Sequence, residues 1–256
     1  MTAPGSFRAP PYTHAIARPR ILLVPLLTEI EWRIKPLLAE WAEVASYDAP
    51  GVGDEPRRGA LDMNALRARG LEEIERRGWE RCLVAGDEHG AFPAIEIAAA
   101  RPEALAGLAI GHACLSYRRR GERPPIRAEV MSAFNRLAEV DFRTYARALT
   151  QLTQDAYDDE TAEEYIRRVP QEVTLAYTPA VFDTVAATEV EPRLRGLDRP
   201  LLFAKHEGCL AWTDEGFEDA VAAFPEARAV TIPQKPSVSP AFAEALREFC
   251  AELDWD

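Results

Sequence analysis

The stretch VAGDEHGA, residues 84–91, joins two segments of different character. Before it, residues 81–85 (RCLVA) form a short apolar run that predicts a buried strand. After it, the alanine-rich residues 91–100 predict a helix. Gly86 and Gly90 allow the backbone to turn sharply and to pass close to its neighbours. We therefore expect a tight strand-to-helix turn that places Glu88 at the carboxyl end of its strand, the edge at which open α/β sheets bind ligands.

The same alternation of strands and helices continues on both sides of this turn. Further strands are predicted at residues 20–26, 45–47, 105–110, 200–204 and 228–232, and helices at residues 32–43, 66–77, 214–224 and 240–253. Strands that alternate with helices indicate an α/β fold, a mostly parallel sheet with helices on both faces. Prolines are dense before residue 20 and disfavour strands there, so we expect any N-terminal hairpin to be shortened or missing and the main sheet to have roughly six strands.

The chain divides into a core and an insertion. Residues 117–195 are polar and helical and lack strand patterns, which predicts a helical cap inserted into the fold. The core then consists of residues 1–116 and 196–256.

Composition excludes some classes of partner. The chain has 256 residues, 47% of them hydrophobic, and a net charge of −12, which disfavours nucleic acids and anionic membranes as partners. No apolar run reaches the length of about 18 residues that a membrane span requires, and the N-terminus lacks a signal-peptide pattern. We expect a cytoplasmic protein with reduced cysteines that binds a small molecule, and the composition leaves its oligomeric state open.

Two motifs resemble those of the α/β-hydrolase superfamily. The turn at residues 86–90 resembles the nucleophile elbow Gly-x-Ser-x-Gly, with Glu88 in the position of the serine. Residues 48–54, DAPGVGD, resemble the Asp-x-x-Gly-x-Gly-x-Ser loop that follows another strand of that fold. The resemblance covers residues 20–253 and implies an α/β-hydrolase core with an inserted cap.

The catalytic residues depart from the family pattern. The loop expected to carry the family acid has Gly208 or Cys209 at that place, and residues 233–238, where the family histidine belongs, contain none. No histidine follows His206 anywhere, so a Ser-His-Asp mechanism is excluded by the absence of its base. Haloalkane dehalogenases and epoxide hydrolases attack with a carboxylate at the elbow but also need a histidine base, so this alternative is less favoured.

The strands that end near Glu88, His112 and His206 are expected to be consecutive neighbours. Adjacent strands lie about 5 Å apart, so these three side chains could lie side by side. We interpret Glu88 and His112 as the candidate catalytic pair, because a carboxylate beside a histidine can transfer protons. Alternatively, His112 only hydrogen-bonds a backbone carbonyl. A two-histidine, one-carboxylate metal site lacks the usual ligand spacing, and we expect neither a metal nor a cofactor.

Five further residues are candidates for substrate binding. Leu26 and Leu27 belong to the loop that would supply oxyanion contacts, where the family has His-Gly but this chain has Pro25-Leu26. The backbone N–H of His89 would complete such a pocket. Trp32 is expected at the boundary with the cap, and His206 at the end of its strand.

Two classes of function fit this pattern. One is a non-hydrolytic acid–base enzyme, such as a cyclase, dehydratase, isomerase or lyase, acting on a small apolar intermediate of specialised metabolism. The other is a catalytically silent relative that binds a small molecule or a protein. Whether Glu88 serves as an acid, a base or a structural residue stays open at this point.

Overall fold

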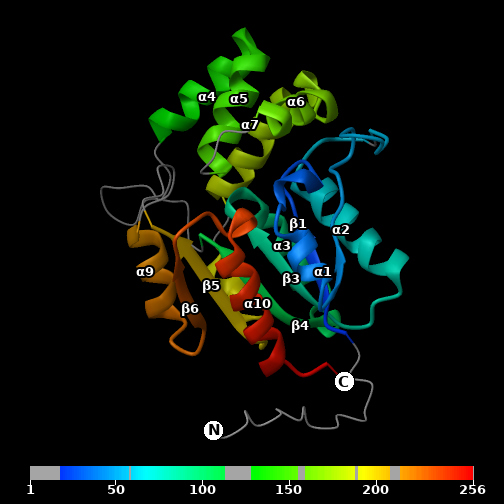
Figure 1. Ribbon diagram of the computed structural model, residues 1–256, viewed down its shortest axis with the longest axis vertical. Helices are drawn as coiled ribbons and strands as arrows, with labels where there is room; N and C mark the ends of the chain where they lie inside the picture. The colour runs from blue at the N-terminus through cyan, green and yellow to red at the C-terminus, as the bar shows by residue number, and fades with distance from the viewer. Residues whose placement is uncertain are drawn as a thin grey trace, which may run out of the picture.

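The computed structural model describes residues 18–57, 59–112, 128–154, 159–187, 190–207 and 214–255. In this part of the chain six parallel strands form one sheet in the order β2-β1-β3-β4-β5-β6 (Figure 1). The strands are β1 (Arg20–Val24), β2 (Glu43–Ala45), β3 (Cys82–Asp87), β4 (Leu105–Gly111), β5 (Leu201–His206) and β6 (Arg228–Ile232). The expected α/β fold and the six strands are thus confirmed. The proline-rich residues 1–17 lie outside the described residues.

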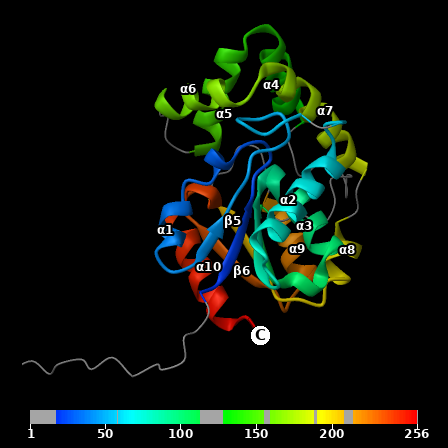
Figure 2. The ribbon, with the colours of Figure 1, turned by 90° about the vertical axis from the view of Figure 1, so that its right-hand side faces the viewer.

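Helices cover both faces of the sheet (Figure 2). On one face lie α1 (Lys35–Ala39) and α10 (Pro240–Glu252). On the other face lie α2 (Met63–Arg77), α3 (Ala91–Ala100), α8 (Glu191–Arg195) and α9 (Asp214–Ala223). Short 3₁₀ turns complete the connections at η1 (Glu29–Glu31), η2 (Glu88–Gly90), η3 (Pro102–Ala104) and η4 (Pro236–Val238).

Each central strand contributes to two hydrophobic cores. In β1, Leu22 and Val24 pack under α2 and α3, whereas Ile21 and Leu23 pack under α1 and α10. Successive side chains of a strand point to opposite faces, so a sheet covered on both sides needs apolar residues throughout. This double burial explains why these strands read in the sequence as uninterrupted apolar runs.

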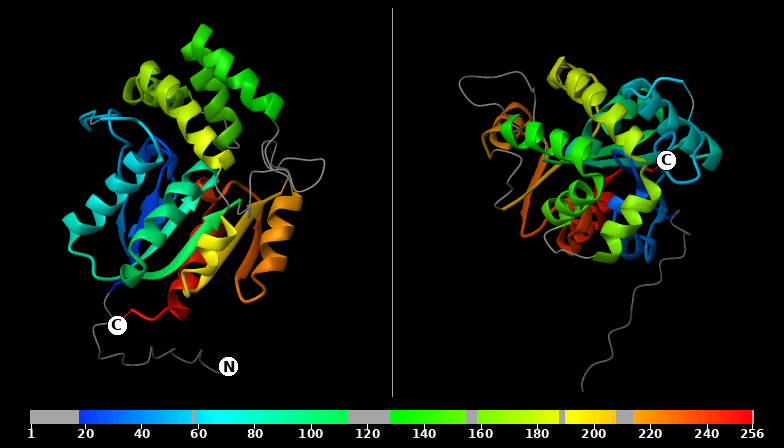
Figure 3. Two further views of the ribbon diagram at one scale, coloured as in Figure 1. Left: turned by 180° about the vertical axis from the view of Figure 1, so that it is seen from behind. Right: turned by 90° about the horizontal axis from the view of Figure 1, so that it is seen from above.

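Four further helices gather beyond the sheet, at one end of the molecule (Figures 1 and 3). They are α4 (Ala128–Val140), α5 (Phe142–Gln154), α6 (Asp159–Arg168) and α7 (Gln171–Ala187). No strand occurs in this part of the described chain. The N-terminal join of the proposed cap, between residues 116 and 117, lies outside the described residues, so the division into core and cap stays a prediction.

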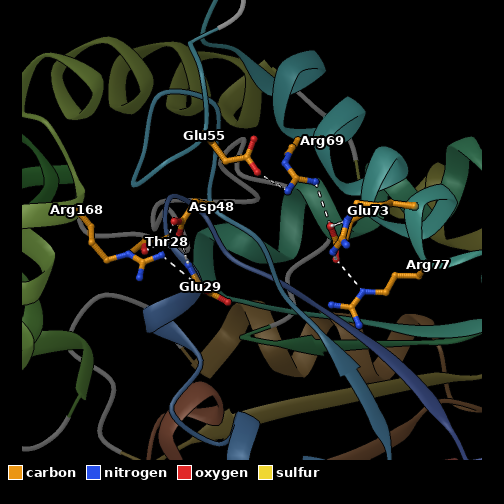
Figure 4. Close-up of polar contacts among 9 residues, drawn as sticks. Thr28, Glu29, Asp48, Glu55, Arg69, Glu73, Arg77 and Arg168 are labelled. Atoms are coloured by element: carbon orange, nitrogen blue, oxygen red, sulfur yellow. Dashed lines mark hydrogen bonds and ion pairs between the residues drawn. The ribbon is translucent and has the colours of Figure 1, made fainter.

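Polar contacts connect these helices to the loops after β1 and β2. The guanidinium of Arg168, at the end of α6, donates to the carboxylate of Asp48 and lies 3.4 Å from Glu29 Oε1 (Figure 4). Asp48 Oδ1 also accepts from the hydroxyl of Thr28 at 2.8 Å and from the backbone N–H of Glu29 at 2.9 Å. The helical segment is therefore held against the carboxyl edge of the sheet, where these loops lie.

The first predicted helix is shorter than expected. Residues 32–43 were expected to be helical, but helix α1 spans only Lys35–Ala39 and β2 begins at Glu43. Pro36 explains the late start, because proline is tolerated in the first turn of a helix but clashes with the carbonyl four residues earlier in its interior.

Two of the four cysteines lie in the described chain, where both are buried free thiols. Burial raises the pKa of Cys82 and of Cys250 to about 12, so both stay protonated and behave as core residues. Cys114 and Cys209 lie outside the described residues. Among the helices that the structure describes, none is both long and apolar enough to span a membrane.

The turn between β3 and α3 has the strained geometry expected of the elbow. Glu88 adopts a φ of +47°, a left-handed conformation that is uncommon for residues other than glycine. A Cβ atom on Gly86 would lie 2.4 Å from the carbonyl oxygen of Gly90 and 2.6 Å from the Cβ of Ala94. A Cβ atom on Gly90 would lie 2.5 Å from the carbonyl oxygen of Val24. The two glycines therefore permit the close packing that holds Glu88 in place.

We predict that Gly86→Ala lowers the free energy of unfolding by about 1–3 kcal/mol or more, because the added methyl group has no space. Gly196→Ala is the matched control, since its Cβ would meet nothing closer than 3.5 Å. Urea denaturation of both variants measures the difference. Equal stabilities would contradict the described packing at the elbow.

Candidate functional site

Glu88 forms a buried ion pair with a lysine from a distant part of the chain. Lys235, in the loop after β6, places its Nζ atom 3.0 Å from Glu88 Oε2. The side chains are only 10% and 11% exposed, so water screens the pair weakly. Lys235 lies within residues 233–238, the segment in which the family resemblance calls for a histidine.

Lys235 is the cation at the centre of several acidic groups. Burial disfavours its charge, but the carboxylates of Glu88, Asp87 and Glu31 outweigh that effect and raise the pKa of Lys235 above its ordinary value. Lys235 is therefore an ammonium ion at neutral pH and is a poor proton acceptor. Its charge can stabilise negative charge that develops on a bound molecule.

Glu31 occupies the backbone amides of the loop after β1. Its Oε2 accepts from the N–H of Leu26 at 3.0 Å, and its Oε1 accepts from the N–H groups of Leu27 and Thr28, each at 3.2 Å. Burial raises the pKa of Glu31, although the charge of Lys235 and these three amides counteract the increase. The N–H groups expected to bind a substrate oxyanion are thus bonded to a carboxylate of the protein itself.

Asp87, the neighbour of Glu88, begins a hydrogen-bonded chain along the sheet edge. Its Oδ1 lies 3.2 Å from Nδ1 of His112, and its Oδ2 accepts from the backbone N–H of Ser237 at 3.0 Å. The Nε2 atom of His112 lies 2.9 Å from Nδ1 of His206. Burial disfavours the charge of Asp87, but the hydrogen bond from His112 and the charge of Lys235 outweigh it and lower the pKa of Asp87.

The residue after Glu88 is a neutral histidine. The ring atom Nε2 of His89 is buried. Burial lowers the pKa of His89 to about 4, and the nearby charge of Glu88 offsets only part of this effect. His89 therefore adds no positive charge to the site at neutral pH.

Only some of the predicted site residues come together as expected. His112 and His206 do lie in contact, but the carboxylate bonded to His112 is that of Asp87, while Glu88 pairs with Lys235. Trp32 is 3% exposed and packs in the core under α1 and α10 rather than at the boundary with the added helices. Leu26 and Leu27 contribute backbone N–H groups, which Glu31 already engages.

Three residues of the site, Glu31, Asp87 and Lys235, are not predicted from the sequence, although local sequence patterns indicate two of them. Lys235 is the only charged residue in the segment 233–238. Thr28-x-x-Glu31 matches a capping box, a pattern in which the glutamate turns back toward backbone N–H groups. Asp87 had no such signal, because its role depends on which neighbour its side chain meets.

No metal site is evident in the described chain. Among those residues, no group of three or more histidine, cysteine, aspartate or glutamate side chains is arranged to hold an ion. The side chains described above offer the carboxylate of Glu88, the histidine pair His112–His206 and the ammonium ion of Lys235.

We predict that Lys235→Met destabilises the fold by about 3–5 kcal/mol, because it leaves buried carboxylates without their cation. Lys205→Met is the matched control: its Nζ lies 2.8 Å from Asp214 Oδ1, but that aspartate side chain is 70% exposed. Loss of this exposed pair should cost about 1 kcal/mol or less. Urea denaturation compares the two, and equal losses would show that burial of the Glu88–Lys235 pair has no energetic consequence.

His89 should make the fold sensitive to mild acid. Its pKa of about 4 lies below the ordinary value of 6.5, so between these values the unfolded chain binds a proton that the folded chain does not. The stabilising contribution is complete above pH 6.5 and is lost as the pH falls toward 4. We predict that His89→Gln loses less stability than the wild type between pH 7 and pH 5 in urea denaturation. Parallel losses in the two proteins would contradict this assignment.

The protein resembles known proteins in its fold and not in its sequence. No protein-family model matches the sequence, and no curated protein matches it. Among solved structures, a hydrolase from Oleispira antarctica superposes with a TM-score of 0.75 at 12% identity, covering 91% of each chain. A bromoperoxidase from Bacillus anthracis gives 0.76 at 15% identity and covers 93% of each chain. An esterase from a Rhodococcus species gives 0.70 at 19% identity, covering 93% of this chain and 92% of that one.

These similarities extend over nearly the whole chain but at low sequence identity. They therefore establish the architecture and leave the chemistry to be argued from the residues of the site. The protein has the α/β-hydrolase fold.

Proposed function

We propose that this protein is a non-hydrolytic acid–base enzyme that acts on a small, largely apolar organic intermediate. The observation that carries the proposal is the buried ion pair between Glu88 and Lys235 at the elbow. It places a proton-transfer group and a fixed positive charge in the position from which enzymes of this fold attack their substrates.

The energetic cost of this pair supports a functional role. A buried ion pair is often no more stabilising than apolar residues of similar size, because both charges lose their hydration. Glu88 is also held in a strained backbone conformation, and such strain is commonly found at functional sites. A residue that only fills space at the elbow would need neither the charge nor its buried partner.

The pair suits the removal of a proton from a carbon beside a carbonyl group. The carboxylate of Glu88 would accept the proton, and the electron pair of the broken C–H bond would move onto the carbonyl oxygen. The ammonium of Lys235 would stabilise that oxygen, since it has three donors and can contact Glu88 and a substrate together. Return of this proton from Glu88 at another carbon gives an isomer. Its transfer instead to a neighbouring hydroxyl, which leaves as water while the electron pair on the oxygen re-forms the carbonyl, gives a dehydrated product.

The same residues disfavour hydrolysis. Glu88 replaces the serine nucleophile, and the loop after β6 offers Lys235, which the surrounding carboxylates keep protonated. The amides of Leu26 and Leu27 are engaged by Glu31, so they do not stand ready for an oxyanion. A mechanism in which Glu88 attacks as a nucleophile would still require a base to activate water for the second step.

A catalytically silent binding protein is the second candidate. The absence of the family histidine and the engagement of the oxyanion amides fit a scaffold that has kept its shape and lost its original chemistry. In both readings the helices α4–α7 serve as a cap over the site, as part of an insertion between residues 117 and 195, and the partner is a small molecule.

Deuterium exchange tests the proposal even while the substrate is unidentified. A panel of small ketones and β-hydroxy carbonyl compounds is incubated with the protein in D₂O, and loss of C–H signals is followed by NMR. We predict exchange in at least one compound, with Glu88→Gln slowing it about 100-fold, the scale of general acid–base catalysis. Glu96→Gln is the matched control and should keep the activity, because this buried glutamate lies on α3 and pairs with Arg193 of α8 rather than with Lys235.

Three other outcomes would each overturn the proposal. Equal exchange by Glu88→Gln and the wild type would leave Glu88 as a structural substitute for serine. A tightly bound metabolite that co-purifies with both proteins, with no exchange by either, would favour the binding protein. Cleavage of p-nitrophenyl esters that Glu88→Gln abolishes would make the protein a hydrolase with a carboxylate nucleophile.

A further inference from the structure

We infer that Asp87, His112 and His206 form a second proton-transfer unit, in which Nε2 of His206 accepts the proton and the other two residues position and polarise it. The three side chains come from the ends of the adjacent strands β3, β4 and β5, and all are buried. The reaction that this unit serves rests on the proposed function, whereas the arrangement of its protons does not.

The direction of the hydrogen bonds follows from the charge of Asp87. A lowered pKa keeps Asp87 ionised, so both of its oxygens can only accept hydrogen bonds. Nδ1 of His112 must therefore carry a hydrogen. The inferred resting state has a neutral His112 ring, whose Nε2 is then an acceptor. In that state the contact at 2.9 Å makes Nδ1 of His206 the donor. The remaining nitrogen, Nε2 of His206, is left without a hydrogen and can act as a base.

The hydrogen-bonded series Asp87–His112–His206 also gives an accepted proton a favourable destination. When a proton binds to Nε2 of His206, the hydrogen on Nδ1 of His206 can cross to Nε2 of His112. The positive charge then rests on His112, directly beside the carboxylate of Asp87. One proton enters, one moves along the chain, and the net charge of the three side chains rises from −1 to 0.

The backbone at Gly111 and His112 fixes the positions of these three side chains. His112 has a left-handed φ of +54°, and its N–H donates to the carbonyl of Ala204 at 2.7 Å, which fixes it against β5. A Cβ atom on Gly111 would lie 2.3 Å from Asp87 Oδ1, so only glycine leaves room for that carboxylate. The absence of a Cβ atom at Gly111 and the left-handed backbone of His112 thus bring Asp87 and His112 together.

This unit narrows the class of substrate. Glu88 at the end of β3 and His206 at the end of β5 lie on the same edge of the sheet, on either side of β4. Two groups that exchange protons at separate points suit a compound that loses a proton at one carbon and receives one at another position. The expected substrate is a small carbonyl compound undergoing isomerisation or loss of water.

NMR of protein labelled with ¹⁵N-histidine tests the proton arrangement directly. The chain has only four histidines, so single substitutions assign their signals. At neutral pH we predict that His112 and His206 both carry hydrogen on Nδ1 and none on Nε2. A hydrogen on Nε2 of His206 in the wild type would overturn the inference.

Asp87→Asn provides the sharper comparison. Ser237 N–H keeps the carbonyl oxygen of the new amide on its own side, so the amide NH₂ group faces His112. Nδ1 of His112 must then accept, and we predict that both histidines change to the form with hydrogen on Nε2. Asp48→Asn is the control, because that buried aspartate bonds Thr28 and Glu29 instead, and it should leave both histidines unchanged.

An unchanged His206 in a folded Asp87→Asn protein would show that the two histidines are not coupled. If that variant fails to fold, His112→Ala replaces it: His206 then loses its acceptor and should show a mixture of both ring forms. Retention of a single form would overturn the inference. Neither experiment measures turnover, so a failure of the Glu88 assay would not be confused with a failure here.

Discussion

The left-handed backbone of Glu88 is the constraint on which the geometry of this site depends. The chain must leave a buried strand and enter a helix within three residues, and Gly86 and Gly90 make that possible because neither position has room for a Cβ atom. The turn sends two successive acidic side chains to different partners. Asp87 meets His112 and the N–H of Ser237, whereas Glu88 meets Lys235. A relaxed turn would remove both sets of contacts together.

A single cation organises the acidic groups that this turn brings together. The ammonium of Lys235 acts on Asp87 at the end of β3, on Glu88 in the turn that follows it, and on Glu31 in the 3₁₀ turn η1 after β1. Two of these carboxylates also accept hydrogen bonds from other groups: Asp87 from His112, and Glu31 from three backbone N–H groups. For Glu88 the structure shows the ion pair with Lys235. Of the three carboxylates, Glu88 is therefore the best placed to exchange its contact with the lysine for a contact with a substrate.

How far the sequence predicts this structure depends on the kind of interaction. Apolar runs and glycine spacing identified the strands, the elbow and the position of Glu88, because local backbone preferences and burial determine them. The contact between His112 and His206 also followed from the order of strands. The pairing of Glu88 with Lys235 did not, since it joins residues far apart in the chain and depends on side-chain direction. Trp32 was misplaced for a related reason: it lies before helix α1, and packing in the core decides the direction of its side chain.

The acid–base chemistry that we propose for this site therefore differs from the hydrolysis named for several structures of similar fold. A serine with a histidine partner exchanges protons easily between neutral groups, whereas Glu88 and Lys235 hold opposite charges in a buried place. Such a pair stabilises charge on a substrate more readily than it generates a nucleophile.

A double-mutant cycle of Glu88→Gln and Lys235→Met, measured by urea denaturation, tests this account most directly. If the buried pair is formed, the cost of either substitution falls when the other is already present, with a coupling of about 1–3 kcal/mol. Additive costs, with no coupling between the two positions, would contradict the account.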